Sequence, residues 1–222
     1  MRDVTHNREE IDRLRKQLDA IWLAEQLDVA AIGKLNIRLK ALIDQPSQGL
    51  SYFDELTRAM GLLAKDPKII FMGQSVAFPG TAMFRTLVDV PKNQLLELPV
   101  AEDMQMGMAI GMSLAGYLPI CIFPRWNFLL LALNQLVNHL DKLPLMSKNG
   151  YRPKVIIRTA IATPNPLDPG PQHLGDYTAA VSSMLSTVNV VRLEQASEIV
   201  VAYDQAIRRD NSSLIVERMD CY

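Results

Sequence analysis

One stretch of the chain has two adjacent acidic residues followed by an unusual combination of glycine and methionine. The stretch reads LPVAEDMQMGMAIGMSLAGYLP over residues 98–119, and its pattern predicts a helix from Glu102 onwards. A carboxylate in the first turn of a helix is stabilised by the partial positive charge of the N-terminus. The same carboxylate can hydrogen-bond a ligand and exchange a proton with it. Glu102 is therefore a candidate binding or catalytic group, and the alternative for both Glu102 and Asp103 is that they only complement the helix dipole.

The small residues of this predicted helix indicate close packing on one face. Gly107, Gly111 and Ala115 recur every four residues and so lie on one side of the helix. Each glycine inside a helix costs roughly 1 kcal/mol relative to alanine, and the close approach of another helix can offset that cost. The methionines between them fill irregular core space more often than they bind a cofactor. We therefore expect this face to pack against another chain or a neighbouring helix.

Two further segments carry side chains that could bind a ligand. Trp126 and Phe128 lie in FPRWNF, at a predicted turn from a strand to a helix, where a ring can stack on a flat ligand or fill the core. The loop ATPNPLDPGPQHLGDY contains four prolines, which stiffen it, and it carries Gln172 and His173. A loop histidine is usually solvated, but beside a carboxylate site it can act as an acid or a base.

From residue 51 onwards, helical and strand patterns alternate. Short apolar strands are predicted near residues 68–73, 94–99, 118–123, 154–160, 188–193 and 213–218, and helices near 51–64, 102–115, 127–146, 175–186 and 196–209. This alternation is typical of a doubly wound α/β fold, a mostly parallel six-stranded sheet with helices on both faces. Ligands in such folds bind beyond the carboxyl ends of the strands, and Glu102 directly follows one of these ends.

The first 48 residues have a different pattern. Two helices are predicted, over about 7–23 and 26–44, and the first carries an apolar stripe that must cover either the main domain or another chain. The sequence DQPSQG at residues 44–49 ends this pattern. We therefore divide the chain into a helical extension, residues 1–48, and a main domain, residues 49–222.

The composition argues against several classes of protein. A net charge of −1 without a long basic segment does not fit a nucleic-acid-binding protein. The longest apolar run, near FLLLAL, is far shorter than the roughly 20 residues that span a bilayer, and the polar N-terminus is unlike a secretion signal. We therefore expect a cytoplasmic protein that binds neither nucleic acid nor membrane. The sequence has no P-loop, no nucleophile elbow and no metal-ligand motif, and its two cysteines form no C-x-x-C pair.

Taken together, these segments resemble the pyrimidine-binding domain of thiamine-diphosphate enzymes of the pyruvate dehydrogenase and transketolase type. The similarity runs from about residue 52 to 218, and it is closest to the beta subunit of the first component of the 2-oxo acid dehydrogenases, without that subunit's C-terminal domain. It rests on four segments in the family's order: DPKIIFMGQSV, LELPVAEDMQMGMAIGMSLAGYLPI, FPRWNFLLLALNQLVNHLDKLPLMSKNG and PQHLGDYTAA.

The resemblance implies roles for the candidate site residues. Glu102 matches the family glutamate that hydrogen-bonds the aminopyrimidine ring of thiamine diphosphate and helps the cofactor to lose the proton of its reactive carbon. Phe128 matches the aromatic residue that stacks on this ring, and Trp126 and Met104 are further expected cofactor contacts. His173 matches a histidine near the substrate entrance that is implicated in handling the substrate or acceptor.

The resemblance also implies a partner subunit. Gly107, Gly111 and Ala115 match a face on which helices of the pyrimidine-binding and diphosphate-binding subunits cross closely. The family's diphosphate and magnesium site, a G-D-G followed by an asparagine, is absent from this sequence. A separate alpha-type subunit is therefore expected to hold both groups in an α2β2 heterotetramer. Gln74 and Leu174 replace an acidic residue and a serine of the family, and these differences concern the choice of substrate.

Three functions remain open at this point. The leading expectation is an enzyme subunit, inactive alone, that decarboxylates a small 2-oxo acid or transfers the resulting acyl or ketol unit to an acceptor. The second is the beta-type subunit of a 2-oxo acid dehydrogenase, which passes the acyl group to lipoamide. The third is a non-catalytic assembly subunit that keeps the fold, and the presence of Glu102 argues against it.

Overall fold

The computed structural model describes residues 13, 14, 17, 50–164 and 168–222. The chain divides into two units, Met1–Gln48 and Gly49–Tyr222, and nearly all described residues belong to the second. The two helices predicted for the extension lie outside the described residues, except that Arg13, Leu14 and Gln17 are helical.

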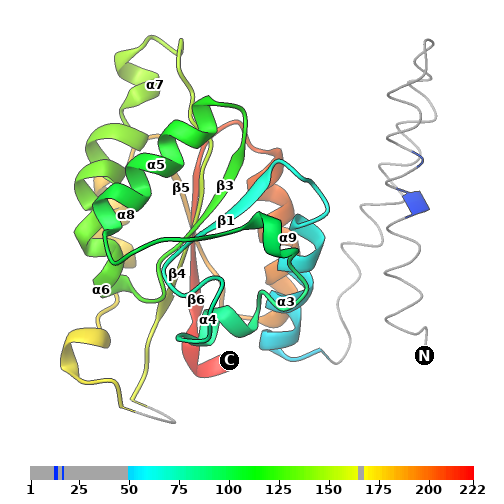
Figure 1. The fold of residues 1–222 in the computed structure, drawn as a ribbon. Coiled ribbons are helices and arrows are strands. Elements are labelled where there is room, and N and C mark those ends of the chain that lie inside the picture. Colours follow the sequence, from blue (N-terminus) through cyan, green and yellow to red (C-terminus); the bar gives the residue numbers. More distant parts are fainter. Residues whose placement is uncertain (1–12, 15–16, 18–49, 165–167) are drawn as a thin grey trace. The chain divides into compact units, whose positions relative to one another are not determined.

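In the described part of the chain, six parallel strands form one sheet (Figure 1). Their order across the sheet is β2-β1-β3-β4-β6-β5, and every neighbouring pair is parallel. The strands are β1 Ile69–Gly73, β2 Leu95–Glu97, β3 Leu118–Ile122, β4 Ile156–Ile161, β5 Asn189–Arg192 and β6 Ser213–Arg218. Phe71 and Met72 point to opposite faces of β1 and are both fully buried, as expected for a sheet that is covered on both sides.

Helices cover both faces of this sheet, which confirms the predicted doubly wound α/β fold (Figure 1). The helices α3 (Tyr52–Leu63) and α9 (Ala196–Arg208) pack together on one face, whereas α5 (Glu102–Leu114), α6 (Trp126–Leu129) and α8 (Thr178–Met184) lie on the other. Ser51 begins α3 because its hydroxyl accepts the N–H of Asp54 at 3.1 Å in a capping box. Among the described helices, none has the length and apolar character that crossing a membrane requires.

The segment from residue 126 to 146 differs from the one long helix that its pattern predicts. It consists of α6, a 3-10 turn at Leu130–Ala132, a π-helix at Gln135–Leu140 and the short helix α7 (Leu143–Met146). Pro144 has no N–H with which to continue a helix, and the buried carboxylate of Asp141 is bound by backbone N–H groups of residues 186–188. The prediction of a regular helix was therefore wrong, although the segment is helical over most of its length.

Buried apolar side chains fill the space between the sheet and the helices α5, α6 and α8. This core includes Met72, Leu98, Met106, Ile110, Trp126, Leu129, Val155, Val181 and Leu214. Because α5 and α6 share this core, the positions at which the two helices begin are fixed relative to the sheet.

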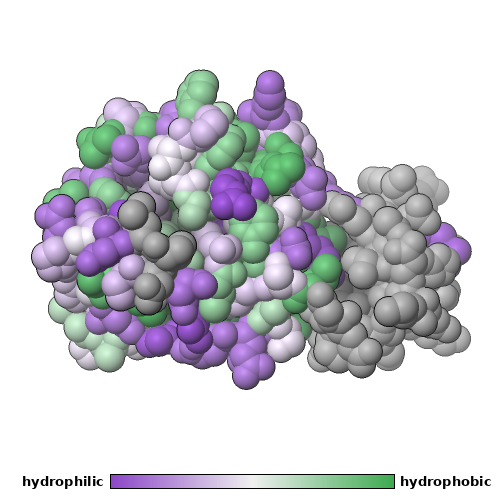
Figure 2. Space-filling model, turned by 90° about the horizontal axis from the view of Figure 1, so that it is seen from below, coloured by the Kyte–Doolittle hydropathy of each residue, from purple (hydrophilic) through white to green (hydrophobic). Residues whose placement is uncertain are grey.

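All six strands end at the same edge of the sheet, which is lowest in Figure 1 and faces the viewer in Figure 2. β2 and β3 lie on opposite sides of β1, so that the connection through α5 passes over β1, an arrangement that forms a ligand crevice in α/β folds. Gly73 ends β1 at this crevice, and a Cβ there would lie 2.4 Å from the carbonyl oxygen of Ile122. Hydrophobic and hydrophilic side chains are intermingled on this edge (Figure 2).

Candidate active site

Glu102 is the first residue of α5 and lies at the edge where the strands end. The residue is only 7% exposed, and its Oε1 atom has no hydrogen-bond partner among the described residues. Leaving a buried polar atom unpaired costs about 1–3 kcal/mol, so such an atom calls for an explanation, and a ligand bound at this edge is one. The first turn of α5 is held in place because Gln105 Nε2 donates to the carbonyl oxygen of Ile122 at 2.8 Å. The start of the helix is thus fixed, and Glu102 Oε1 is free to accept a hydrogen bond from a ligand or to share a proton with it.

Phe128 and His173, from two segments far apart in the sequence, are in contact at this edge. Their ring centroids lie 5.9 Å apart with an angle of 37° between the planes. His173 Nδ1 lies 2.9 Å from Asn127 Oδ1, and His173 Nε2 lies 3.2 Å from Nε2 of Gln172. The turn from β3 into α6 therefore supplies both an aromatic ring and an amide that hold the histidine of the proline-rich loop.

These contacts select one tautomer of the imidazole of His173. Because Asn127 Oδ1 can only accept a hydrogen bond, Nδ1 of the imidazole carries the proton and donates it. Nε2 then holds the lone pair and accepts from the amide of Gln172. A half-buried imidazole whose Nε2 atom holds the lone pair can take a proton from a substrate and return it. Asn127, which directly precedes the candidate stacking ring, is a polar residue that needs a partner if buried, and His173 is that partner.

Trp126 lies inside the hydrophobic core. The residue is 1% exposed, and its ring packs edge-on against Tyr177 at a centroid distance of 6.4 Å. This placement favours the alternative that Trp126 is a core residue, because the indole has no exposed face for a cofactor. Since Tyr177 follows His173 in the same loop, the indole instead supports the segment that carries the histidine.

Arg125 is a further polar residue of this site, and its sequence position predicts that it needs a partner if it is buried. It is the N-cap residue of α6, and its Nε atom is buried without a partner among the described residues. A guanidinium group with an unpaired donor, two residues before Asn127, is suited to bind a carboxylate. Its signal in the sequence is that it carries the only charge in the run IFPRWNF.

Glu102 and the pair formed by Phe128 and His173 are separate parts of the site. Among the described residues, no hydrogen bond or ring contact joins them. α5 begins after β2 and α6 begins after β3, on the two sides of β1, so a ligand that touches both parts must cross the carboxyl end of β1. The loop that follows β1 is fixed by Glu97, whose carboxylate accepts the N–H groups of residues 75–77 at 2.6–2.8 Å.

The outer face of α5 is apolar and open. Met104 and Met108 are 43% and 37% exposed, and a Cβ added at Gly111 would meet nothing within 4 Å. Gly107 and Ala115 lie on the same side, while the inner side of the helix is buried in the core. A helix that is apolar on both sides is typical of one that is covered on both sides. Met104 thus lies on the expected assembly face.

Comparison with known proteins identifies the domain. Residues 49–220 match the family described as "Transketolase, pyrimidine binding domain". The pyruvate dehydrogenase E1 component subunit beta of Staurastrum punctulatum is 28% identical over 164 residues, which cover 71% of this chain and 48% of that protein. The mitochondrial subunit of the same name from Chaetomium thermophilum is 31% identical over 162 residues, which cover 70% and 41%. The chain therefore spans about half the length of the curated relatives that it matches.

Solved transketolase structures share the fold. The structure described as "Split gene transketolase, inactive beta4 tetramer" superposes with a TM-score of 0.59 at 18% identity, covering 76% of this chain and 51% of that chain. The transketolase of Campylobacter jejuni superposes with a TM-score of 0.57 at 11% identity, covering 85% and 32%. Since the family match covers most of the sequence, the chain belongs to the transketolase pyrimidine-binding domain family and is similar to the beta subunits of thiamine-diphosphate-dependent 2-oxo acid dehydrogenases.

Proposed function

We propose that this chain is the pyrimidine-binding, beta-type subunit of a split thiamine-diphosphate enzyme that acts on a small 2-oxo acid. The observation that carries the proposal is the buried carboxyl group of Glu102, whose Oε1 atom is unpaired at the strand-end edge of a domain of this family. A subunit with only an assembly role has no need for such a group, because an unpaired buried oxygen lowers the stability of the fold.

The residues at this edge fit the aminopyrimidine half of the cofactor. Glu102 Oε1 would hydrogen-bond a nitrogen of the pyrimidine ring, and the ring of Phe128 would pack against its face. When bound, thiamine diphosphate supplies the carbon nucleophile that adds to the 2-oxo group and the electron sink for decarboxylation. His173 would move a proton at Nε2 during the reaction of the substrate, and the guanidinium of Arg125 would bind the substrate carboxylate.

The outer face of α5 supports an alpha-type partner that would hold the diphosphate and magnesium in an α2β2 heterotetramer. Met104, Met108 and Leu114 are exposed there, and the space beside Gly111 is open to the backbone of another helix. Covering this apolar surface with a second subunit removes it from water, which favours association.

The acceptor of the acyl group distinguishes the leading function from a second candidate. In the leading function, the acyl group passes to an acceptor other than lipoamide or is released after decarboxylation. The second candidate is transfer of the acyl group to lipoamide, and it is favoured by the curated relatives, which are pyruvate dehydrogenase beta subunits. Turnover of the assembled enzyme with and without a lipoylated protein separates these two reactions.

Calorimetric titration with thiamine diphosphate and Mg²⁺ tests the proposal. The full chain alone is expected not to bind, and its mixture with a diphosphate-binding alpha-type subunit is expected to bind tightly. In the mixture, Glu102→Gln should lower 2-oxo acid turnover by on the order of a hundredfold or more, without loss of assembly. Asp103→Asn, an exposed carboxylate in the same helical turn, is the matched control and should leave turnover unchanged.

Two results would contradict this function. Tight binding by the isolated chain would mean that the diphosphate site is not supplied by a partner. Normal turnover of the Glu102→Gln variant would remove the catalytic role and favour a non-catalytic assembly subunit.

A further inference from the structure

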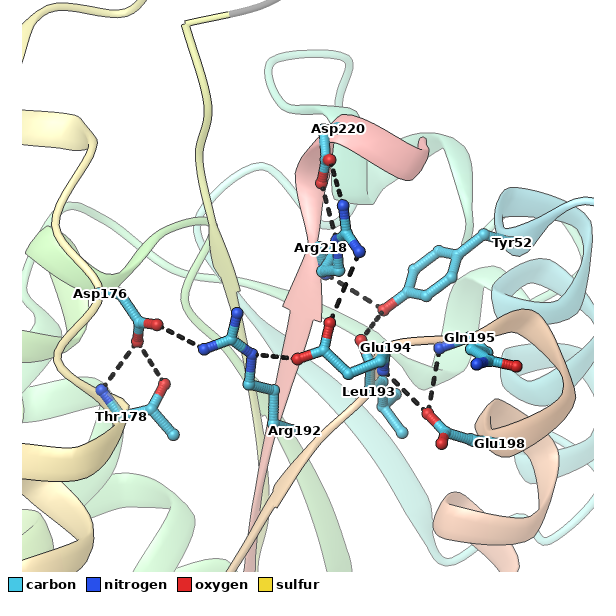
Figure 3. Close-up of polar contacts among 10 residues, drawn as sticks. All are labelled: Tyr52, Asp176, Thr178, Arg192, Leu193, Glu194, Gln195, Glu198, Arg218 and Asp220. Carbon is cyan, nitrogen blue, oxygen red and sulfur yellow. Dashed lines mark hydrogen bonds and ion pairs between the residues drawn. The ribbon is translucent and has the colours of Figure 1, made fainter.

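Five charged side chains of alternating sign form a continuous chain across the carboxyl ends of β5 and β6 (Figure 3). In spatial order they are Asp176, Arg192, Glu194, Arg218 and Asp220, and we refer to them as the charge strap. Arg192 Nη1 lies 2.6 Å from Asp176 Oδ2, and Arg192 Nε lies 2.5 Å from Glu194 Oε1. Arg218 continues the strap, with Nη1 at 3.5 Å from Glu194 Oε2 and Nη2 at 2.6 Å from Asp220 Oδ2.

The middle of the charge strap is fixed to two helices. The hydroxyl of Tyr52 in α3 donates to the carbonyl oxygen of Leu193 at 3.0 Å and accepts the N–H of Arg218 at 3.1 Å. The carboxylate of Glu198 in α9 accepts the N–H of Glu194 at 2.8 Å. The backbone on both sides of the strap is thereby tied to the body of the domain, so the strap has a rigid base (Figure 3).

One end of the charge strap is Asp176, which lies in the same loop as His173. Its Oδ1 atom accepts the N–H and the hydroxyl of Thr178 at 3.0 and 2.5 Å, and its Oδ2 atom accepts from Arg192. Burial raises the pKa of Asp176, but the hydrogen bonds from Thr178 and the charge of Arg192 outweigh this effect and lower the pKa. The carboxylate therefore stays ionised and keeps its contact with Arg192 at neutral pH.

The loop has little freedom between His173 and Asp176. A Cβ added at Gly175 would lie 2.4 Å from the ring of Tyr177, so that ring lies directly over the loop backbone. Tyr177 in turn packs against the buried ring of Trp126. Only Leu174 and Gly175 lie between His173 and Asp176, so a displacement of Asp176 is expected to shift the histidine as well.

We propose that Arg192 is a positioning residue for His173. Through Asp176, it holds residues 173–176 in place, so that the imidazole stays against Phe128 and Asn127. The inference rests on the proposed function insofar as His173 acts on the substrate. Each exposed ion pair of this kind contributes little to overall stability, so the strap acts on the geometry of the loop.

Histidine NMR of the full chain tests the positioning without the partner subunit. The chain contains three histidines, and a His173→Gln variant identifies the signals of His173. Arg192→Gln should shift these signals and weaken the nuclear Overhauser effect between His173 and Phe128, whereas Arg192→Lys, which keeps the charge, should stay closer to the wild type. At 1 M NaCl, where the Debye length is about 3 Å, the wild-type signals should move towards those of Arg192→Gln.

The matched control is Arg208→Gln, which removes an ion pair of similar length on α9. Arg208 Nε lies 2.7 Å from Asp204 Oδ2, and its loss should leave the His173 signals unchanged. Unchanged His173 signals in a folded Arg192→Gln variant would overturn the proposal, whatever reaction the enzyme catalyses.

Turnover of the mixture with the alpha-type protein separates this proposal from the proposed function. Arg192→Gln should lower kcat/KM for the 2-oxo acid on the order of tenfold to a hundredfold, with unchanged cofactor affinity, because a small misplacement of a catalytic group is costly. In a His173→Gln background the same change should add nothing further. Shifted His173 signals together with normal turnover of both single variants would leave the positioning intact and remove His173 from the proposed function.

Discussion

The carboxylate of Asp141 joins the end of the π-helix to the segment before β5, and removing its charge should destabilise the domain. The side chain is 0% exposed. Oδ1 accepts the N–H groups of Thr187 at 2.6 Å and Val188 at 3.0 Å, and the N–H of Ser186 lies 2.9 and 3.0 Å from the two oxygens. Oδ2 also pairs with Lys142 Nζ at 2.7 Å. Asp141→Asn keeps the shape of the side chain but replaces one carboxylate oxygen by an NH₂ group, which cannot accept the hydrogen bonds of these N–H donors.

The pKa of Asp141 sets the size of the effect. Burial raises this pKa, but the bonds from Lys142 and from the backbone of residues 186–188 outweigh burial and bring it from 3.8 to about 2. At about 1.36 kcal/mol per pKa unit, the ionised form stabilises the folded state by roughly 2 kcal/mol more than the protonated form does. For a domain of this size, such a loss lowers Tm by roughly 4–8 °C.

The sign of the pH dependence follows from the lowered pKa. The stabilisation is fully present above the pKa of the unfolded chain, near pH 4, and is lost as the pH falls from about 4 to about 2. Urea unfolding of the full chain at pH 7, 5, 4 and 3 measures it. Asp141→Asn should be less stable than the wild type by roughly 2 kcal/mol at pH 7, with a gap that narrows below pH 4.

The control for this experiment is Asp204→Asn, because Asp204 pairs with Arg208 on the surface of α9. Its loss should change the free energy of unfolding by less than about 0.5 kcal/mol at every pH. Our reasoning is refuted if Asp141→Asn costs no more than this control, or if the gap between Asp141→Asn and the wild type stays constant from pH 7 to pH 3.

Three other substitutions have definite expected outcomes. Gly111→Leu should keep the chain folded, because a Cβ there meets nothing within 4 Å, but it should weaken association with the alpha-type subunit in sedimentation. The control is Ser182→Leu on α8, and equal association of both variants would contradict the assignment of the outer face of α5 as the assembly face. Glu217→Gln leaves the fully buried Arg158 without its ionised partner and should cost about 3–5 kcal/mol in urea unfolding, whereas a loss below 1 kcal/mol would show that the pair is not buried in solution. Phe128→Ala should weaken thiamine-diphosphate binding by the assembled mixture by roughly 0.5–1.5 kcal/mol in calorimetry, and unchanged affinity would discard the stacking role.

The sheet could be predicted from the sequence because its inner strands contain short apolar runs that are buried on both faces, as in IIFMG and LPICI. The break in the segment 126–146 could not. Its apolar residues repeat at helical spacing, and the backbone N–H groups that bind the Asp141 carboxylate lie 45 residues or more further along the chain. The spacing of apolar residues shows which face of a helix is buried, but it contains no information about a hydrogen bond to a residue so far along the chain.

The candidate site shows the same limit at the level of single residues. Glu102 could be placed at the strand-end edge because it starts a helix directly after a strand. Trp126 and Phe128 lie two residues apart in one turn, and only tertiary packing, which includes the contact with Tyr177, decides that the first ring is buried. The contact between Asn127 and His173 spans 46 residues, so the tautomer of the histidine is a property of the tertiary structure alone.

The oxidation of the methionines of α5 can report whether another subunit covers this helix. Met106 is buried in the core, whereas Met104 and Met108 are exposed on the outer face of the same helix. Peroxide oxidises an accessible thioether to the sulfoxide much faster than a buried one. Mass spectrometry of one peptide would therefore show oxidation at Met104 and Met108 in the free chain, protection of both in an assembled complex, and Met106 as an internal reference in either state.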